Sequence, residues 1–380
     1  MSELIPGATV GVVGGGQLGR MLAEAASPLG VEVLVLDPTP ECPASPPATD
    51  QIVADFDDES AIRDLAARVD VLTLEIELAD PEGLREASAE TGTPVHPAPA
   101  DLETTRDKLA EARSLADAGI PVADFRRVDE DDDLAAAFDV LGTPLMLKAR
   151  HGGYDGRGNA VVDTISEATT YFGTLDDLVA EQLVDFEREL SVIGVRGHDA
   201  IATYPVAENR HEAEILRETL VPARTDDAVH DRAEAVARDV IAQMDGRGVF
   251  GIELFETTDG EILVNEIAPR PHNSGHYTIE GTVTSQFEQH VRAILGHPLG
   301  ETALRAPTAM VNLLGTGEEN RSATLSGVED ALAMANAHFH WYGKRDVRPL
   351  RKMGHVTATG SGLATARSTA NAARDAIDFE

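Results

Sequence analysis

Two glutamates that face each other across a predicted β-hairpin are the side chains best placed to do chemistry in this chain. An Asp-Gly dipeptide at 259–260 separates two apolar, β-forming runs and is typical of a two-residue hairpin turn. A turn of that length sets Thr258 opposite Glu261. Counting outward along both strands then places Glu253 opposite Glu266 on the same face. The Cβ atoms of such a pair lie about 5 Å apart, and the facing carboxylates repel each other unless one is protonated or a cation lies between them.

A divalent cation is the simplest way to hold this pair of carboxylates. Mg²⁺ prefers oxygen ligands, typically takes only one or two carboxylates, and completes its shell with water and phosphate oxygens. Glu253 and Glu266 are therefore predicted to bind Mg²⁺ beside the phosphates of a nucleotide. The alternative is two solvated acids on an exposed strand of an acidic protein. The polar residues of the Pro- and Gly-broken loop that follows favour a site: Arg270, His272, Asn273 and His276.

The composition is that of an acidic globular protein. The chain has 380 residues, 42% of them hydrophobic, enough for two or three domains with ordinary cores. Its net charge is −35, from 66 acidic and 31 basic residues spread along the sequence. This distribution argues against nucleic-acid binding by a broad surface. Dispersed acidity with very little lysine indicates a halophilic protein, adapted to a cytoplasm in which salt screens the self-repulsion.

The sequence also limits where the protein is expected to be found. No apolar run is long enough to span a bilayer, and no signal-peptide pattern begins the chain. We therefore expect a cytoplasmic protein that does not bind membranes. The single cysteine, Cys42, excludes internal disulfides and any cysteine-based metal cluster.

Lysine is rare in this chain, whereas arginine is used freely. Surface lysines have been removed, so those that stay are enriched for positions that need a compact, flexible ammonium, such as phosphate contacts. For Lys148 and Lys352 we favour such a function. For Lys108 a functional and a surface position are equally supported. The complete set is Lys108, Lys148, Lys344 and Lys352.

The first hundred residues alternate short apolar strands with helical periodicity, which predicts βαβ units and a parallel sheet. Strands are predicted at 9–13, 32–36 and 71–76, with helices from Gln17 and over 58–68. Further helices are predicted at 101–120 and 226–244. The predicted domains are 1–98, 99–300 with a flap subdomain at 121–190, and 301–380.

A glycine-rich turn at 14–19 invites a dinucleotide interpretation. It follows a strand and opens a helix, and Asp37 ends the next strand where a dinucleotide fold places its ribose-binding acid. No hydride-transfer machinery follows, so we reject a nicotinamide cofactor. We retain a phosphate-bearing ligand at the helix N-terminus, with Gln17 as a contact. A purely structural tight turn is the alternative.

A second glycine-rich stretch, 149–159, follows the strand that ends at Lys148. Its glycines predict a β-hairpin flap whose N–H groups close over phosphates, while Lys148 supplies a point charge. The next strand ends at 181–184, where its backbone groups can meet an adenine edge. Glu189 can then reach a ribose.

These motifs resemble one family over essentially the whole chain. The chain is similar to the N5-carboxyaminoimidazole ribonucleotide synthases, also described as the ATPase subunit of phosphoribosylaminoimidazole carboxylase. Four motifs in the correct order carry the resemblance, at 14–21, 152–158, 265–276 and 341–352. The resemblance implies an α/β protein with the ATP-grasp fold, an N-terminal Rossmann-like parallel-sheet domain and a small C-terminal domain.

The same resemblance implies a reaction. ATP would drive the carboxylation of 5-aminoimidazole ribonucleotide by bicarbonate, giving N5-carboxyaminoimidazole ribonucleotide, ADP and phosphate in purine biosynthesis. The residues implied to hold ATP are Arg106, Lys148, Gly153, Tyr154, Asp155, Gly156, Arg157, Gly158, Asn159, Glu181, Gln182, Leu183, Val184, Glu189, His211, Asn265 and Glu266. Those implied to surround the ribonucleotide and bicarbonate are Tyr154, Asp155, Arg157, His272, Asn273, Lys344, Arg351 and Lys352.

One further element of the family is matched only in part. Glu75 and Glu77 correspond to a Glu-x-Glu element and end the third strand, where an α/β sheet places ligands. Glu77 therefore joins the predicted ribonucleotide contacts. Leu78 stands where family members often have Asn or His.

The chemistry requires residues of these types. Bicarbonate is a poor electrophile, so its oxygen is expected to attack the γ-phosphoryl group first, giving carboxyphosphate, while Mg²⁺ and basic side chains neutralise the developing charge. Because carboxyphosphate hydrolyses readily, the flap and the His272 loop should close and exclude water. Arg270 is predicted to bind the bicarbonate-derived carboxylate, and either His272 or Asp155 to accept the amine proton. The predicted catalytic set is Arg270, His272, Asn273, Tyr154, Asp155 and Arg157, with Arg351 and Lys352 at the 5′-phosphate.

Two competing functions stay open. One is another ATP-grasp ligase, such as a formate-dependent ribonucleotide transformylase or a biotin carboxylase, and the basic cluster at 344–352 argues against it. The other is a non-catalytic nucleotide-binding regulatory subunit, which would not need the His272 loop beside a metal pair. The resemblance also suggests a homodimer, and the labile carbamate product allows a hand-off to a mutase.

Overall fold

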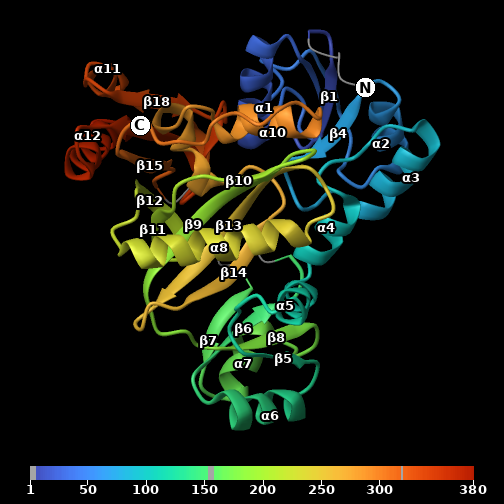
Figure 1. The fold of residues 1–380 in the computed structure, drawn as a ribbon, viewed down its shortest axis with the longest axis vertical. Helices are drawn as coiled ribbons and strands as arrows, with labels where there is room; N and C mark the ends of the chain where they lie inside the picture. Colours follow the sequence, from blue (N-terminus) through green and yellow to red (C-terminus); the bar gives the residue numbers. More distant parts are fainter. Residues whose placement is uncertain (1–5, 153–157, 318–319) are drawn as a thin grey trace.

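In a computed structural model of the chain, residues 6–152, 158–317 and 320–380 are described. The N-terminal unit is a parallel sheet of order β3-β2-β1-β4 with helices on both faces (Figure 1). Val33 and Val35 pack on one face under α1, whereas Leu34 and Leu36 pack on the other face under α2 and α3. The elements are β1 (Thr9–Val13), α1 (Gln17–Ala26), the 3-10 turn η1 (Ser27–Leu29), β2 (Glu32–Leu36), β3 (Asp50–Ile52), α2 (Glu59–Ala66), β4 (Val71–Leu74), α3 (Pro81–Thr91) and α4 (Pro99–Thr105).

A small antiparallel sheet of order β5-β8-β6-β7 lies at one end of the molecule's long axis, with α6 and α7 packed on it (Figure 1). The sheet lies within residues 121–190, where the flap subdomain is predicted. Its elements, with the helix that precedes them, are α5 (Lys108–Asp117), β5 (Phe125–Val128), α6 (Asp131–Leu141), β6 (Leu145–Ala149), β7 (Asn159–Val162), α7 (Ile165–Phe172) and β8 (Leu178–Gln182).

A large sheet of order β14-β13-β9-β11-β12-β15-β20-β18 forms the centre of the molecule, and β10 pairs with β9 at its side. Helix α8 packs on β9, β13 and β14, and helix α10 contacts both β13 and α1, so it joins the sheet to the N-terminal unit. The elements up to residue 294 are β9 (Phe186–Arg196), β10 (Ile201–Thr203), β11 (Ala207–Glu212), β12 (Ile215–Val221), α8 (Asp227–Gln243), β13 (Gly248–Thr257), β14 (Ile262–Ala268), η2 (Asn273–Gly275), α9 (Thr278–Gly281) and α10 (Gln286–Ile294).

The C-terminal part continues the same large sheet. β15 pairs with β12 on one side and with β20 on the other, and α12 covers both β15 and β20 (Figure 1). The sheet therefore crosses residue 300, where a domain boundary is predicted. The elements are β15 (Thr308–Leu314), β16 (Arg321–Ser322), β17 (Leu325–Ser326), α11 (Val328–Leu332), β18 (Ala337–Trp341), β19 (Asp346–Val347), β20 (Lys352–Thr359), α12 (Leu363–Asp375) and β21 (Asp378–Phe379).

The β13–β14 hairpin shows one correct prediction and one wrong one. The predicted pairing of Thr258 with Glu261 is wrong, because the Thr257 N–H bonds to the Glu261 carbonyl and leaves a three-residue turn. One extra residue in β14, Asn265, forms a bulge and shifts the register by one. The bulge compensates for the longer turn, so Glu253 does pair with Glu266 as predicted.

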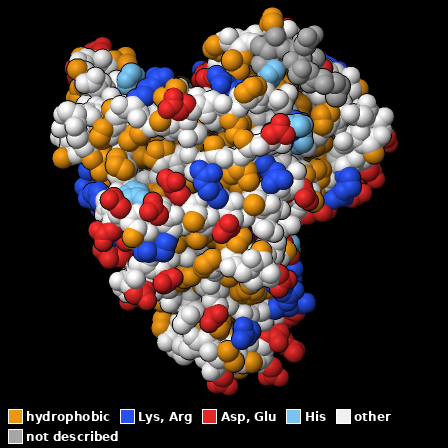
Figure 2. All heavy atoms as spheres, in the orientation of Figure 1, with side chains coloured by type: hydrophobic (Ala, Val, Ile, Leu, Met, Phe, Trp, Pro, Cys, Tyr) orange, Lys and Arg blue, Asp and Glu red, His pale blue; other side chains and the backbone are white. Residues whose placement is uncertain are grey.

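Two other elements differ from the predicted ones. The helix predicted over 101–120 is two helices, α4 and α5, because Asp107 adopts an extended conformation and caps α5 by accepting the N–H groups of Leu109 and Ala110. The third strand ends at Leu74 rather than at residue 76. Acidic side chains are scattered over the face shown in Figure 2 rather than gathered in one patch. Among the described residues, no helix has both the length and the apolar character needed to cross a membrane.

Candidate active site

The paired glutamates of β13 and β14 lie between a lysine and a histidine. Glu266 Oε2 accepts a hydrogen bond from Lys108 Nζ at 2.9 Å. Glu253 Oε1 lies 3.7 Å from His272 Nε2. Glu266 keeps 49% of its side chain accessible and Lys108 15%. The pair therefore opens onto solvent on the Glu266 side while Glu253 is more enclosed.

The two carboxylates differ in their acidity. Burial is the main reason that the pKa of Glu253 is raised; the charge of His211 opposes this rise and that of Glu266 adds to it. The pKa of Glu266 is lowered, chiefly by the charge of Lys108. A hard divalent cation would stabilise this pair of oxygen donors. Its positive charge would offset both the repulsion between the two carboxylates and the cost of ionising the buried Glu253. Glu253 and Glu266 therefore fit Mg²⁺ by chemistry and by register.

Lys148 is buried, at 7% exposure, and contacts Asn265, the residue next to Glu266 in β14. Its ammonium forms an ion pair with Glu181 at 2.6 Å and donates to Asn265 Oδ1 at 3.3 Å. The bulge at Asn265 is what turns this amide toward β6. A cavity of about 20 Å³ is lined by Lys108, Lys148, Glu181 and Asn265, among others. Three residues predicted to bind ATP are thus brought together from β6, β8 and β14.

The glycine-rich flap joins β6 to β7. Asn159 pairs with Lys148 at the start of β7, and Gly158 accepts the Ala149 N–H through its carbonyl at 2.7 Å. Arg106, another predicted ATP residue, is half-buried just after α4. The predicted residues Gly153, Tyr154, Asp155, Gly156 and Arg157 lie outside the described residues.

The segment predicted to face adenine and ribose follows the flap. Gln182 and Leu183 are exposed at the end of β8, and Val184 is half-buried. Glu189 on β9 forms an ion pair with His211 on β11 at 2.5 Å. Burial lowers the pKa of His211, but the hydrogen bond to Glu189 and the charge of Glu253 outweigh it, so that its pKa is raised. The cationic form of His211 is therefore favoured beside the Glu253 carboxylate.

The loop after β14 carries the polar residues predicted to be catalytic. Arg270 binds Glu77 of the N-terminal unit at 2.7 Å, which ties the loop to the end of β4. Asn273 is 6% exposed, and neither its side-chain oxygen nor its nitrogen has a hydrogen-bond partner among the described residues. A buried amide of this kind fits a small polar ligand that supplies the missing partners. Burial lowers the pKa of His272 well below its ordinary value, and the charge of Arg270 adds to this, so the imidazole is neutral.

The basic cluster near the C-terminus reaches the same region. Lys344 Nζ donates to the carbonyl of Lys352 at 2.6 Å and lies 5.7 Å from the centre of the Tyr342 ring. Arg351 donates to the carbonyl of Asp346 at 2.7 Å. These contacts hold Lys344 and the two predicted phosphate ligands, Arg351 and Lys352, around the start of β20.

Lys352 lies close enough to the carboxylate pair to affect its titration. After the larger effects of burial and of the neighbouring carboxylates and His211, its charge also lowers the pKa of Glu253. Burial and Arg270 lower the pKa of His272, and Lys352 adds to that shift. The large sheet therefore brings the C-terminal cluster beside the carboxylate pair, although the two are about 90 residues apart in the sequence.

The N-terminal glycine-rich turn has partners within the protein. The N–H of Gly15 donates to Asp37 Oδ2 at 2.9 Å, and those of Gly16 and Gly19 donate to the Glu75 carboxylate at 2.5 and 2.9 Å. These amides are therefore bound by protein carboxylates, which is the structural alternative to a phosphate site. Burial raises the pKa of Glu75 despite the two backbone hydrogen bonds. Gln17 is half-buried at the first residue of α1, and its contact with a ligand stays a prediction.

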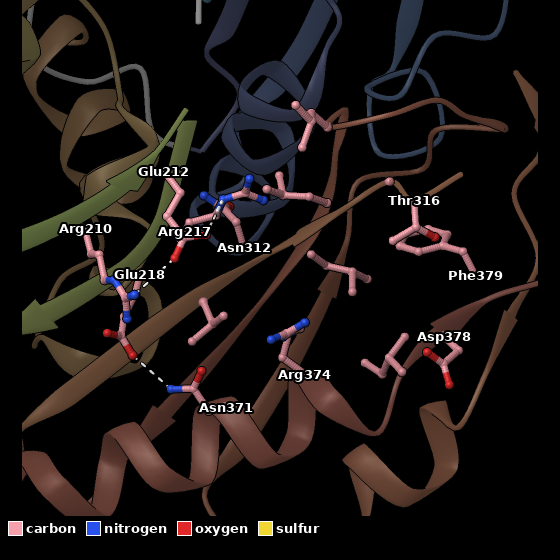
Figure 3. A pocket seen from close by; sticks show the side chains of 16 residues that line it. Arg210, Glu212, Arg217, Glu218, Asn312, Thr316, Asn371, Arg374, Asp378 and Phe379 are labelled. Atoms are coloured by element: carbon pink, nitrogen blue, oxygen red, sulfur yellow. Dashed lines mark hydrogen bonds and ion pairs between the residues drawn. The ribbon is translucent and has the colours of Figure 1, made fainter. Parts of the chain in front are cut away.

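A separate cavity of about 370 Å³ lies between the β11–β12 hairpin, β15 and α12 (Figure 3). It contains none of the predicted site residues. Its most buried acid, Glu218, is already bound by Arg367 at 2.8 Å and Asn371 at 2.9 Å. This cavity is therefore separate from the candidate active site described above.

Sequence reasoning missed three residues of the site or left them undecided. Lys108 forms an ion pair with Glu266, and the scarcity of lysine was the only feature of the sequence that indicated a role for it. Glu111 on α5 is buried and accepts the Ile267 N–H at 3.2 Å; burial, then the charge of Glu266, raise its pKa well above the ordinary value. Gln286 holds the loop that carries His272 by its side-chain amide. Neither Glu111 nor Gln286 belongs to a motif that could have indicated its role.

Comparisons with known proteins agree with this geometry. Residues 7–106 match the ribonucleotide synthetase preATP-grasp domain, residues 113–287 the ATP-grasp domain, and residues 308–369 the phosphoribosylaminoimidazole carboxylase C-terminal domain. The chain is 42% identical over 361 residues to the N5-carboxyaminoimidazole ribonucleotide synthase of Brucella melitensis, covering 94% of this chain and 97% of that protein. The chain belongs to the N5-carboxyaminoimidazole ribonucleotide synthase family.

Solved structures of N5-carboxyaminoimidazole ribonucleotide synthases have the same fold. The crystal structure of the Thermotoga maritima synthetase is 40% identical, covers 98% of this chain and 99% of its own, and has a TM-score of 0.89. The Aspergillus clavatus synthase, crystallised with ADP and 5-aminoimidazole ribonucleotide, is 36% identical with a TM-score of 0.88, covering 98% of both chains. The predicted ATP-grasp fold, with its N-terminal parallel-sheet unit and small C-terminal unit, is confirmed, and the chain is an ATP-grasp ligase.

Proposed function

We propose that this ligase carboxylates 5-aminoimidazole ribonucleotide with bicarbonate and ATP, giving N5-carboxyaminoimidazole ribonucleotide, ADP and phosphate. Membership of the synthase family supports the reaction. The observation that favours this acceptor over those of other ATP-grasp ligases is the match of residues 308–369 to the phosphoribosylaminoimidazole carboxylase C-terminal domain, which carries the basic cluster around Lys352.

ATP is proposed to lie between the small antiparallel sheet and the large sheet. Lys148 and Asn265 meet at this junction and would contact phosphate, while the exposed backbone at 182–184 would meet the adenine edge. Glu189, held by His211, is proposed to accept a ribose hydroxyl. The flap residues 153–157 are proposed to cover the phosphates, as the resemblance implies.

Glu253 and Glu266 are proposed to hold Mg²⁺, which when bound neutralises charge on the phosphoryl oxygens. Lys108 stays beside Glu266 in this arrangement and adds a second positive charge. His211 and Lys352 contribute further positive charge near Glu253. The site thus concentrates cations where the γ-phosphoryl group gains negative charge.

Bicarbonate is proposed to bind beside Arg270 and the buried amide of Asn273. One bicarbonate oxygen attacks the γ-phosphorus, the bond to the β-phosphate oxygen breaks, and ADP leaves with carboxyphosphate formed. The exocyclic amine of the ribonucleotide then attacks the carboxyl carbon, either of carboxyphosphate or of CO₂ released from it, and phosphate departs. His272 is neutral and can accept the amine proton at a ring nitrogen, which leaves Asp155 as the alternative base.

The ribonucleotide is proposed to lie between the C-terminal cluster and the N-terminal unit. Lys344, Arg351 and Lys352 would bind its 5′-phosphate. Glu77, held by Arg270, and Gln17 would contact it from the N-terminal unit.

The salt dependence of the protein is proposed from its net charge, and its partners from the family resemblance. A net charge of −35 with four lysines suits a halophilic protein, so activity should rise with potassium chloride. A homodimer, a hand-off of the carbamate product to a mutase, a cytoplasmic location and the domain boundaries at 98 and 300 stay predictions.

Isotope transfer tests the carboxyphosphate route. With bicarbonate labelled in all oxygens by ¹⁸O, each phosphate released should carry one ¹⁸O, because the oxygen that attacks phosphorus stays on it when the bond to carbon breaks. Mass spectrometry of the phosphate measures this. Unlabelled phosphate, formed at the full rate of turnover, would contradict the proposed reaction.

A further inference from the structure

One buried side chain, that of Gln286, holds the loop that carries His272. Gln286 is the first residue of α10 and is completely buried. Its Oε1 accepts the His272 N–H at 2.9 Å, and its Nε2 donates to the His272 carbonyl at 2.7 Å. Nε2 also lies 3.3 Å from His276 Nδ1. One amide therefore binds both ends of the 272–276 turn.

The orientation of this amide is determined by the backbone. The His272 N–H can only donate and the His272 carbonyl can only accept, so the oxygen and nitrogen of Gln286 cannot be exchanged. Its Nε2 must then donate to His276 Nδ1, which places the proton of that neutral imidazole on Nε2. Burial lowers the pKa of His276 well below its ordinary value, in agreement with a neutral ring.

Two glycines allow this close contact on either side of the loop. A Cβ at Gly275 would lie 2.5 Å from Gln286 Oε1, and a Cβ at Gly251 of β13 would lie 2.4 Å from the Cβ of His272. The loop is thus pressed between Gln286 and β13. The same arrangement directs His272 Nε2 toward Glu253, at 3.7 Å.

We propose that Gln286 is a positioning residue for the carboxylation step: it fixes the His272 loop so that His272 and Asn273 meet the reacting groups beside the carboxylate pair. This inference rests on the proposed function, because it assigns the loop to the transfer of the carboxyl group. Gln286 touches no residue predicted to bind ATP among the described contacts, so its loss should affect the chemical step and leave ATP binding intact.

Gln289 provides a matched control on the same helix. It is also completely buried, and its amide binds one residue's backbone in the same way, accepting the Gly300 N–H at 2.7 Å and donating to the Gly300 carbonyl at 2.8 Å. Gly300 lies outside the predicted site. Gln289→Met should therefore cost the protein about the same in stability as Gln286→Met without moving His272.

The test compares the two variants in steady-state kinetics and in hydrogen exchange. For Gln286→Met we expect kcat for ribonucleotide-dependent carboxylation to fall about 100-fold, as displacement of a catalytic group by about 1 Å can cause. KM for ATP should stay within about twofold of wild type, and less product should form per ADP, because water competes for the intermediate. Gln289→Met should keep wild-type kcat and product yield. Exchange in the peptide covering 270–277 should rise only in Gln286→Met.

Equal kinetics in the two variants, or a defect confined to KM for ATP, would overturn the proposal. If Gln286→Met does not fold, Gln286→Glu keeps the volume and the acceptor for the His272 N–H but loses a donor, and the same fall in kcat is expected at neutral pH. A wild-type protein without ribonucleotide-dependent turnover would instead contradict the proposed function. In that case, faster hydrogen exchange at 270–277 in Gln286→Met alone would still support the role of Gln286 in fixing the His272 loop. Equal hydrogen exchange in both variants would overturn that role.

Discussion

Removing one charge from the carboxylate pair separates its proposed catalytic role from any structural one. In Glu266→Gln the side chain keeps its shape but loses the charge that binds Lys108 and is proposed to bind Mg²⁺. Because Glu266 is 49% accessible, its ion pair with Lys108 should contribute at most about 1 kcal/mol to the free energy of unfolding. The loss of a metal ligand at a phosphoryl-transfer site costs several kcal/mol of transition-state stabilisation. A loss of about 4 kcal/mol corresponds to roughly a 1000-fold fall in turnover.

The assay is ADP release at saturating bicarbonate and ribonucleotide over a titration of Mg²⁺, together with thermal unfolding. We expect turnover to fall by about three orders of magnitude and the Mg²⁺ requirement to rise, with little change in the unfolding temperature. Glu261→Gln is the control, because this acid lies at the exposed end of the same hairpin. Turnover in Glu266→Gln close to that of Glu261→Gln would refute the metal assignment.

Three further changes test other parts of the structure. Glu75→Gln should lower the free energy of unfolding by about 1–3 kcal/mol in a urea titration, because one buried glycine N–H of the N-terminal turn would lose its acceptor. Gly251→Ala should lower kcat at least about tenfold in the ADP-release assay, because its Cβ would displace His272. Glu189→Gln should lower the unfolding temperature more at pH 6 than at pH 9. The raised pKa of His211 gives stability that is complete below its ordinary value of 6.5 and is lost as pH rises through the folded value.

Each of these has an outcome that would count against it. Unchanged unfolding in Glu75→Gln would mean that the turn does not depend on that carboxylate. Gly362→Ala is the control for Gly251→Ala, since nothing lies within 4 Å of a Cβ at Gly362, and equal activity in the two would contradict the packing argument. A destabilisation by Glu189→Gln that grows toward pH 9 would contradict the assignment of the ion pair.

The parts of the fold that follow from local pattern were predictable. Strands β1 and β2 have the predicted bounds because each is a continuous apolar run in a sheet buried on both faces. The break between α4 and α5 was missed although Asp107 is a good N-cap, because the apolar period continues across it. The extension of the large sheet through β15 was not predicted, since pairing between strands 90 residues apart leaves no local pattern.

The carboxylate pair shows how a correct prediction can rest on an incomplete reason. Counting from a two-residue turn placed Glu253 opposite Glu266, but the turn has three residues and the bulge at Asn265 restores the register. A bulge depends on what its strand packs against, so neither the turn length nor the bulge could be read from the residues alone. Gln286 could not be found at all, because its contacts lie in a loop with no periodicity, 10 to 14 residues away.

The release of ADP in high-potassium buffer with Mg²⁺ and bicarbonate, with and without 5-aminoimidazole ribonucleotide, tests the central claim most directly. We predict that ADP formation depends on the ribonucleotide and yields one acid-labile carboxylated product per ADP. ADP release at the same rate without the ribonucleotide, or none with it from a folded protein that binds ATP, would contradict the proposed reaction.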